Sequence, residues 1–256
     1  YEGSLELYRI NGTYSGDSRY NDTLPNFLSV EFKKKEKKFL EYYQSALMNF
    51  DSADLNPNQS MSKRILTREL QLELEGKTFN TDFMPINQMW TFQLTIGQLA
   101  SGKGAQPFKT PQDYRNWLVR LEGYLEWLGS AEEKMKKGIE KGYVLPKSLI
   151  IKVLPQLLAM TKKDLTKHLF YSPIKQIPED FTVEEKKEFK SAYSNMIENR
   201  IVPAYQRLYD FMATTYLEAG RESSGFEAFP DGGAYYQYAI RVYSSTSLVA
   251  DSIHRL

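Results

Sequence analysis

The sequence contains no cysteine, which excludes disulfide bonds, thiolate zinc sites and a cysteine nucleophile from its 256 residues. An excess of either charge is also missing, because 33 basic residues face 32 acidic ones and leave a net charge of +1. This balance provides no long-range attraction to nucleic acid or to an anionic membrane. No apolar run approaches the roughly 18 residues of a membrane-spanning helix. We therefore expect no nucleic-acid partner.

Signatures of familiar catalytic sites are missing too. The two histidines, His168 and His254, lie far apart in sequence, and neither belongs to a His-Glu-x-x-His motif. Nucleophile elbows, Walker loops and dinucleotide fingerprints do not occur, and Gly102-Lys103-Gly104 lacks the strand and helix that surround a phosphate loop. Glu132-Glu133 and Glu184-Glu185 are adjacent pairs on expected helix surfaces, so their carboxylates point apart. We assign no catalytic residue, no metal ligand and no cofactor to this chain.

Helical periodicity is what the sequence does show. From Thr110 to Leu128, apolar residues recur at spacings of three and four, which places them on one helical face. Thr110 is suited to cap the N-terminus of this helix, with Pro111 at its first position. Thr182 and Glu185 form a second capping signal, before a helix predicted to exceed thirty residues and to bend at Pro203.

Four further segments favour helices: Leu28–Phe50, Lys63–Gly76, Ile86–Leu99 and Pro146–Met160. Glycine and proline mark loops between them, for example over Gly138–Pro146. The lysines within 33–38 fit a solvated helix face better than a binding patch. The fold class is therefore all-α, an irregular multi-helix array with long, partly kinked helices and at most a small β element. We expect a single helical domain over residues 1–256.

The sequence changes in character from Gly225 onward, where aromatic residues crowd around Pro230 and the Gly232-Gly233 pair: Phe226, Phe229, Tyr235, Tyr236, Tyr238 and Tyr243. Two interpretations stay open. The rings pack under a surface loop, or they form one wall of a ligand site in which tyrosine phenols donate hydrogen bonds.

The same tail carries a distinctive series of residues: Arg221, Gly225, Ala228-Phe229-Pro230, Gly232-Gly233, Tyr235-Tyr236, Arg241, Thr246, Leu248 and Ile253-His254. Further pieces precede it in order: Gly16-Asp17, Arg19-Tyr20-Asn21-Asp22, Gly142, Val144, Pro146 and Pro203-Ala204-Tyr205. Together these residues resemble the bacterial domain-of-unknown-function family 885 over nearly the whole chain.

The resemblance implies a mainly helical, exported lipoprotein of the periplasm or cell envelope, held at the membrane through an N-terminal lipid anchor. It also implies a C-terminal half, missing from these 256 residues, with a His-Glu-containing helix similar to zinc metallopeptidases. Zinc and peptidase activity are thus expected only of the longer protein, and the segment alone is expected to be inactive. Where the family often has Thr-Pro, this chain has Val249-Ala250, which predicts a weaker helix cap before His254.

Two functions follow from these observations. In the first, the chain forms one wall of a peptide-binding cleft that the missing C-terminal half completes; the substrate-binding candidates are then Tyr235, Tyr236, Arg241 and His254. In the second, the chain belongs to a non-catalytic surface lipoprotein that holds peptide or glycan on its tyrosines. A family member that has kept the fold and lost activity is a third interpretation.

Overall fold

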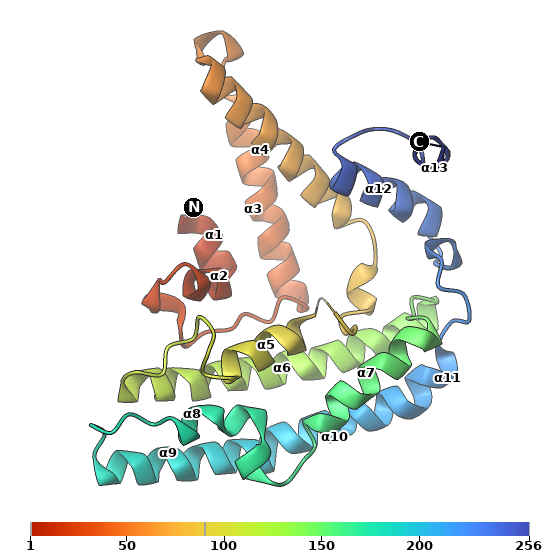
Figure 1. The fold of residues 1–256 in the computed structure, drawn as a ribbon. Helices are drawn as coiled ribbons and strands as arrows, with labels where there is room; N and C mark the ends of the chain where they lie inside the picture. Colours follow the sequence, from red (N-terminus) through yellow and green to blue (C-terminus); the bar gives the residue numbers. More distant parts are fainter. Residues whose placement is uncertain (1, 90, 256) are drawn as a thin grey trace. The chain divides into compact units, whose positions relative to one another are not determined.

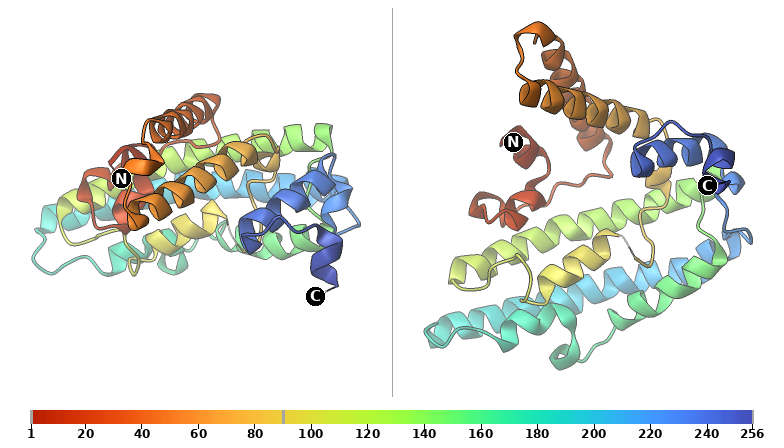
Figure 2. Two further views of the ribbon diagram at one scale, coloured as in Figure 1. Left: turned by 90° about the horizontal axis from the view of Figure 1, so that it is seen from above. Right: turned by 45° about the horizontal axis from the view of Figure 1, so that its top comes forward.

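The computed structural model describes residues 2–89 and 91–255. It is 72% helical and 1% strand, which confirms the all-α fold class (Figures 1 and 2). The helices in chain order are α1 (Glu2–Leu7), α2 (Arg9–Tyr14), α3 (Val30–Met48), α4 (Pro57–Gly76), α5 (Phe92–Ala100), α6 (Pro111–Lys141), α7 (Lys147–Ala159), α8 (Ser172–Lys175), α9 (Val183–Met196), α10 (Val202–Phe211), α11 (Leu217–Ala219), α12 (Gly232–Ser244) and α13 (Ala250–His254). Within this described part, the β structure consists of one isolated parallel bridge between Pro146 and Arg221. None of its helices has the length and apolarity needed to cross a membrane.

The chain divides into two compact units. Unit 1 combines the N-terminal residues up to Ser29 with Asp82–Glu222 and contains α1, α2 and α5 to α11. Unit 2 combines Val30–Thr81 with the residues from Ser223 onward and contains α3, α4, α12 and α13. The single domain expected from the sequence stays a prediction.

Helix α6 is the longest element of unit 1 and begins where the sequence predicts. The Thr110 hydroxyl accepts from the Asp113 N–H and the Asp113 carboxylate accepts from the Thr110 N–H, which forms a capping box. The helix runs beyond Leu128 and ends at Gly142, whose φ of 77° is in the left-handed region. The loop predicted over Gly138–Pro146 is therefore wrong in its first part. Gly138 is buried inside α6, where a side chain would meet the Tyr143 carbonyl oxygen at 2.6 Å.

The helix predicted after Thr182 is helical from Val183 to Ala219, so its length is confirmed. The Thr182–Glu185 capping box is present at its start. Two π-helical turns, Ile197–Ile201 and Met212–Tyr216, interrupt the α geometry. The first lies directly before Pro203, which has no N–H to give to the preceding turn, so the wider turn accommodates the missing hydrogen bond. The bend expected at Pro203 stays a prediction.

Other helix starts differ from the sequence-based boundaries. Helix α4 begins at Pro57, ahead of Lys63, because Asn56 and Gln59 form a capping box that extends it. Helix α5 begins at Phe92, so the helix predicted from Ile86 starts too early.

The hydrophobic core belongs to unit 1 and is rich in aromatic rings. Helices α6, α7, α9 and α10 enclose it (Figure 2). Its largest fully buried side chains include Tyr114, Trp117, Tyr124, Trp127, Phe170, Phe189, Tyr193 and Tyr216. The Tyr124 and Tyr205 hydroxyls, 2.7 Å apart, satisfy one another inside it. Burial raises the pKa of both phenols, which therefore stay neutral at physiological pH.

A fully buried arginine lies beside this core. The Arg120 guanidinium on α6 donates to the side chains of Gln106 and Thr13 and to the Tyr20 carbonyl. Burial lowers its pKa to about 10, with Asp22 and Tyr14 partly opposing the shift, so the group stays charged at neutral pH. Tyr20 and Asp22 come from the N-terminal motif of the family resemblance. The motif therefore has a structural role in unit 1.

Replacing Arg120 should destabilise unit 1 strongly. In Arg120→Met, two buried acceptors and one partly buried acceptor lose their donor, and we expect a loss of about 3–5 kcal/mol in the free energy of unfolding. Arg115→Met is the matched control, because Arg115 lies on the same helix and forms an exposed pair with Glu188. That change should cost less than about 1 kcal/mol. Urea unfolding monitored by tryptophan fluorescence measures both, and equal losses would contradict the assigned role of Arg120.

Candidate substrate-binding surface

Helix α12 begins with the Gly232-Gly233 pair. The turn before the helix leaves no room for a side chain at Gly232. A Cβ at Gly232 would overlap the backbone carbonyl of Phe226, whereas one at Gly233 would meet no atom within 4 Å. The short 3-10 turn Phe226–Ala228 therefore lies directly on the first turn of α12. This close approach explains why the sequence has glycine at the start of the helix.

Tyr235, one of the four candidate residues, lies in an aromatic cluster of unit 2, which we call the C-terminal aromatic cluster: Phe79, Phe226, Tyr235, Tyr236 and Tyr238. Ring centroids are 5.4 Å apart between Phe79 and Tyr235 and 5.3 Å apart between Phe226 and Tyr235. The Tyr238 hydroxyl donates to the Leu72 carbonyl of α4 at 3.1 Å. Burial raises the pKa of Tyr235, so its phenol is a neutral hydrogen-bonding group. The cluster joins α12 to the end of α4.

Arg241, the second candidate, is already engaged within unit 2. Its guanidinium pairs with the Glu75 carboxylate of α4, and Arg68 donates to the Arg241 backbone carbonyl at 2.5 Å. The side chain is 30% exposed, so one edge of the group still faces solvent. A substrate carboxylate would have to compete with Glu75 for it.

Tyr236 and His254 are brought together from α12 and α13. The Tyr236 hydroxyl lies 3.5 Å from His254 Nε2, at the outer limit of a hydrogen bond. His254 is exposed and Tyr236 is half-buried. Helix α13 begins at Ala250, and Val249 before it provides no side-chain cap, as the Val249-Ala250 pair predicts. The two polar groups therefore meet at the surface. His254 lies on the short helix α13, whose N-terminus has no side-chain cap to stabilise it.

The described residues do not fit a zinc site. They contain no group of three or more histidine, aspartate and glutamate side chains near enough to share a metal ion. His168 is buried with both ring nitrogens engaged by the backbone: Nδ1 accepts from the Phe170 N–H at 3.3 Å, and Nε2 lies 3.1 Å from the Met160 carbonyl. It caps the short turn at Leu169–Tyr171 and offers no lone pair to a metal.

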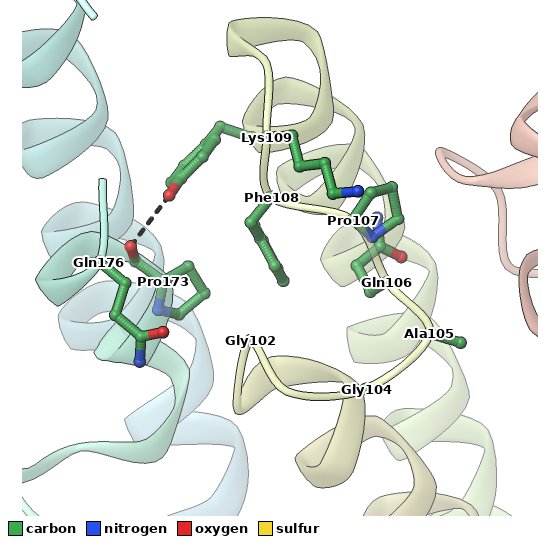
Figure 3. Close-up of a pocket in the computed structure, with 10 residues that line it drawn as sticks. Gly102, Gly104, Ala105, Gln106, Pro107, Phe108, Lys109, Pro173 and Gln176 are labelled. Atoms are coloured by element: carbon green, nitrogen blue, oxygen red, sulfur yellow. Dashed lines mark hydrogen bonds between the residues drawn. The ribbon is translucent and has the colours of Figure 1, made fainter. Parts of the chain in front are cut away.

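Unit 1 contains a separate pocket of about 310 Å³ (Figure 3). The Gly102–Gly104 turn lies on one side, Pro173 and Gln176 lie on the other, and Phe108 projects between them. The Gln106 side chain is occupied by Arg120, and the Tyr114 hydroxyl donates to the Pro173 carbonyl at 3.0 Å. Among the described residues that line it there is neither a histidine nor a carboxylate. The pocket has no evident acid or base for catalysis.

A second, more open groove of about 320 Å³ lies over the π-helical turn before Pro203. Charges of both signs line it, and Arg200 pairs with Glu122 through hydrogen bonds of 3.1 and 2.7 Å. Arg207 and Glu126 are exposed at its edge. This is a solvated ion-pair surface of unit 1.

Sequence reasoning missed the partners that hold the candidate residues in place. Phe79, Glu75 and Arg68 lie more than 150 positions before Tyr235 and Arg241, and nothing in the local sequence pairs them. The ion pair between Arg241 and Glu75 could be predicted only by knowing that α12 runs antiparallel to α4. The functional role of the four candidates stays a prediction.

The Gly232-Gly233 pair offers a sharp test of the local geometry. Gly232→Ala forces the Phe226–Ala228 turn away from α12, and we expect a loss of about 1–3 kcal/mol with faster amide exchange in α12. Gly233→Ala, in open space one residue later, should be neutral or stabilise the helix by up to about 1 kcal/mol. Hydrogen exchange followed by mass spectrometry compares the two. Equal protection in both variants would show that the close approach is unimportant.

His168 predicts a pH dependence of stability. Burial lowers its pKa below the ordinary value of about 6.5, and the contact with the Met160 carbonyl offsets this only in part. The stabilisation by neutral His168 is therefore complete above pH 6.5 and is lost as the pH falls toward the folded-state pKa, because the unfolded chain takes up the proton first. The slope approaches about 1.4 kcal/mol per pH unit. His168→Gln should remove it, and exposed His254→Gln should not, in urea titrations from pH 7.5 to 5.

Comparisons with known proteins support the fold. The chain is similar to a crystal structure titled "putative lipoprotein from Colwellia psychrerythraea", with a TM-score of 0.85 and 20% sequence identity. The similarity covers 98% of this chain and 46% of that one, so the chain spans just under half the length of its structural relative. No curated protein matches the sequence.

A family model described as "Bacterial protein of unknown function (DUF885)" matches residues 10–256. The match contains both the N-terminal motif around Arg120 and the Gly232-Gly233 signature of α12, so the resemblance seen in the sequence is confirmed. This chain belongs to the DUF885 family of bacterial proteins.

Proposed function

We propose that this chain is the helical, substrate-holding part of a longer cell-envelope protein, whose further polypeptide supplies a zinc-peptidase site. The observation that carries the proposal is that α12 and α13 of unit 2 bear Tyr235, Tyr236, Arg241 and His254, with the Tyr236 hydroxyl 3.5 Å from His254 Nε2. These side chains offer phenol, guanidinium and imidazole groups to the carbonyls and carboxylates of a peptide. The structural relative supports the location, since it is described as a lipoprotein, and supports the length, since it is more than twice as long.

In this proposal the described residues bind and do not catalyse. Tyr236 and His254 act as hydrogen-bond donors to the substrate, and the C-terminal aromatic cluster positions Tyr236 by packing. Arg241, held by Glu75, is a fixed positive edge that favours an acidic or C-terminal carboxylate. The metal ligands and the general base belong to the remaining polypeptide, because the described residues contain no ligand cluster.

A non-catalytic function has its own support. Partly exposed aromatic and hydrogen-bonding side chains, with no metal-ligand group among the described residues, are typical of surfaces that hold peptide or glycan without cleaving it. The same four residues would then bind a ligand at the cell surface, and the protein would be a binding lipoprotein.

Two measurements on the natural gene product, expressed to its own stop codon, distinguish the two functions: its metal content and its peptidase activity. We expect about one zinc per chain, cleavage of a mixed peptide library and loss of cleavage with a chelator. The 256-residue chain alone should hold no stoichiometric zinc and cleave nothing. Tyr236→Phe and His254→Gln should each lower kcat/KM about tenfold, the equivalent of one lost hydrogen bond.

Tyr243→Phe is the matched control, because Tyr243 lies on the same helix and is 90% exposed. It should change kcat/KM less than about twofold. A gene product without zinc or activity that still binds peptides, and binds them more weakly in the two test variants, would support the binding lipoprotein. A product that neither cleaves nor binds would contradict both functions.

A further inference from the structure

Exposed apolar side chains are distributed unevenly between the two units. Among the described residues, eleven of the seventeen exposed large hydrophobic side chains belong to unit 2, which holds about a third of the chain. The hydrophobic core cluster lies entirely in unit 1. Soluble proteins seldom leave large apolar side chains exposed together unless another surface covers them. Unit 2 therefore resembles part of a larger packed structure.

Six of these side chains lie on the outer half of the α3–α4 hairpin, between positions 42 and 66, which we call the hairpin tip: Tyr42, Met48, Phe50, Met61, Ile65 and Leu66. Their exposed fractions range from 43% to 76%. Met61 and Ile65 are one turn apart on the same face of α4. Inside the tip the contacts are polar, since the Lys63 ammonium donates to the Phe50 carbonyl at 2.5 Å. The six apolar side chains are exposed.

The other helices of unit 2 do not cover this surface. Helix α12 packs against the last turns of α4, through Tyr238 on the Leu72 carbonyl and Arg241 on Glu75. Arg68 also donates to the Arg241 carbonyl, so α12 reaches the inner border of the hairpin tip, next to Leu66. Met48, Phe50 and Met61 lie near the turn between α3 and α4, away from these contacts. Its apolar side chains are therefore open within unit 2.

We propose that the hairpin tip is a docking surface for the polypeptide that follows residue 256 in the natural protein. This inference rests on the proposed function, in which the chain is part of a longer protein. The structural relative contains more than twice the length that this chain covers. Helix α13 belongs to unit 2, so polypeptide beyond it leaves from the same unit that carries the tip.

The chemistry of the tip favours this occupant over two others. Acidic Glu41, Asp51 and Asp54 accompany basic Lys63 and Arg64, so the tip offers no net positive charge to an anionic membrane. Six side chains are also few beside the roughly 20–30 residues per side of a stable interface between separate molecules. A segment of the same chain does not lose the translational freedom of a free partner, so a smaller apolar surface suffices.

Site-specific cross-linking in the full natural gene product tests the docking surface. A photoreactive p-benzoylphenylalanine replaces Ile65, which is 55% exposed, and in a matched control it replaces Ile151 of unit 1, which is 57% exposed. After irradiation and digestion, we expect position 65 to be joined to peptides from beyond residue 256 within one chain. Position 151 should show no such products. In parallel, Ile65→Gln should lower the melting temperature by about 2–4 °C, and Ile151→Gln by less than about 1 °C.

Every other result overturns the proposal. Cross-links between two copies would make the tip a dimer surface, and cross-links to residues 82–222 would assign it to unit 1. Cross-links to lipid alone, or a coding sequence that ends at residue 256, would leave no docking segment. These readouts use neither zinc nor peptide. A cross-linked but inactive protein would therefore contradict the peptidase function and support the docking surface, while an active protein with cross-links elsewhere would do the reverse.

Discussion

A charged guanidinium can stay inside a protein only where acceptors surround it, and Arg120 imposes this condition on unit 1. Its acceptors come from α2, from the turn at Tyr20 and from the loop that holds Gln106, at positions up to 107 residues from Arg120. Removing any of these segments would leave the buried guanidinium with one acceptor fewer, so the N-terminal residues cannot separate from α6 at low cost. The burial of one arginine thus fixes how the start of the chain is placed against the central helix.

The helices of this protein follow closely from local signals in the sequence. Capping boxes at Thr110 and Thr182 mark true helix starts, since a side chain that satisfies a free N–H acts within three residues and leaves a readable pattern. Boundaries that depend on distant packing were predicted less well. Gly138 predicts a loop by its residue type, but it lies inside α6. Glycine is needed there because the Tyr143 carbonyl approaches too closely for a side chain. The division into two units has no local signal, because it joins Val30–Thr81 to the far end of the chain.

The candidate site shows the same limit. The sequence places Tyr235, Tyr236 and Arg241 close together in the chain, and the resemblance adds His254, but helix α12, which carries the first three, was not predicted. The sequence does not reveal that Glu75 pairs with Arg241 or that Phe79 supports Tyr235, because these contacts depend on the pairing of α12 with α4. Arg241 is therefore held by its ion pair with only part of its guanidinium in solvent, whereas Tyr236 and His254 contact one another at the surface.

The uneven burial of the two units bears directly on how such a surface works. Binding groups discriminate best when packing fixes their positions before the ligand arrives. Unit 1 meets that condition, with fully buried aromatic rings on α6 and α9, but the candidate residues lie on unit 2, where α13 lacks a cap and large apolar side chains are exposed. Unit 2 would gain rigidity from any polypeptide that covers the hairpin tip. Order in the candidate site would then depend on that contact, so the proposed substrate binding at α12 and α13 would depend on the proposed docking at the hairpin tip.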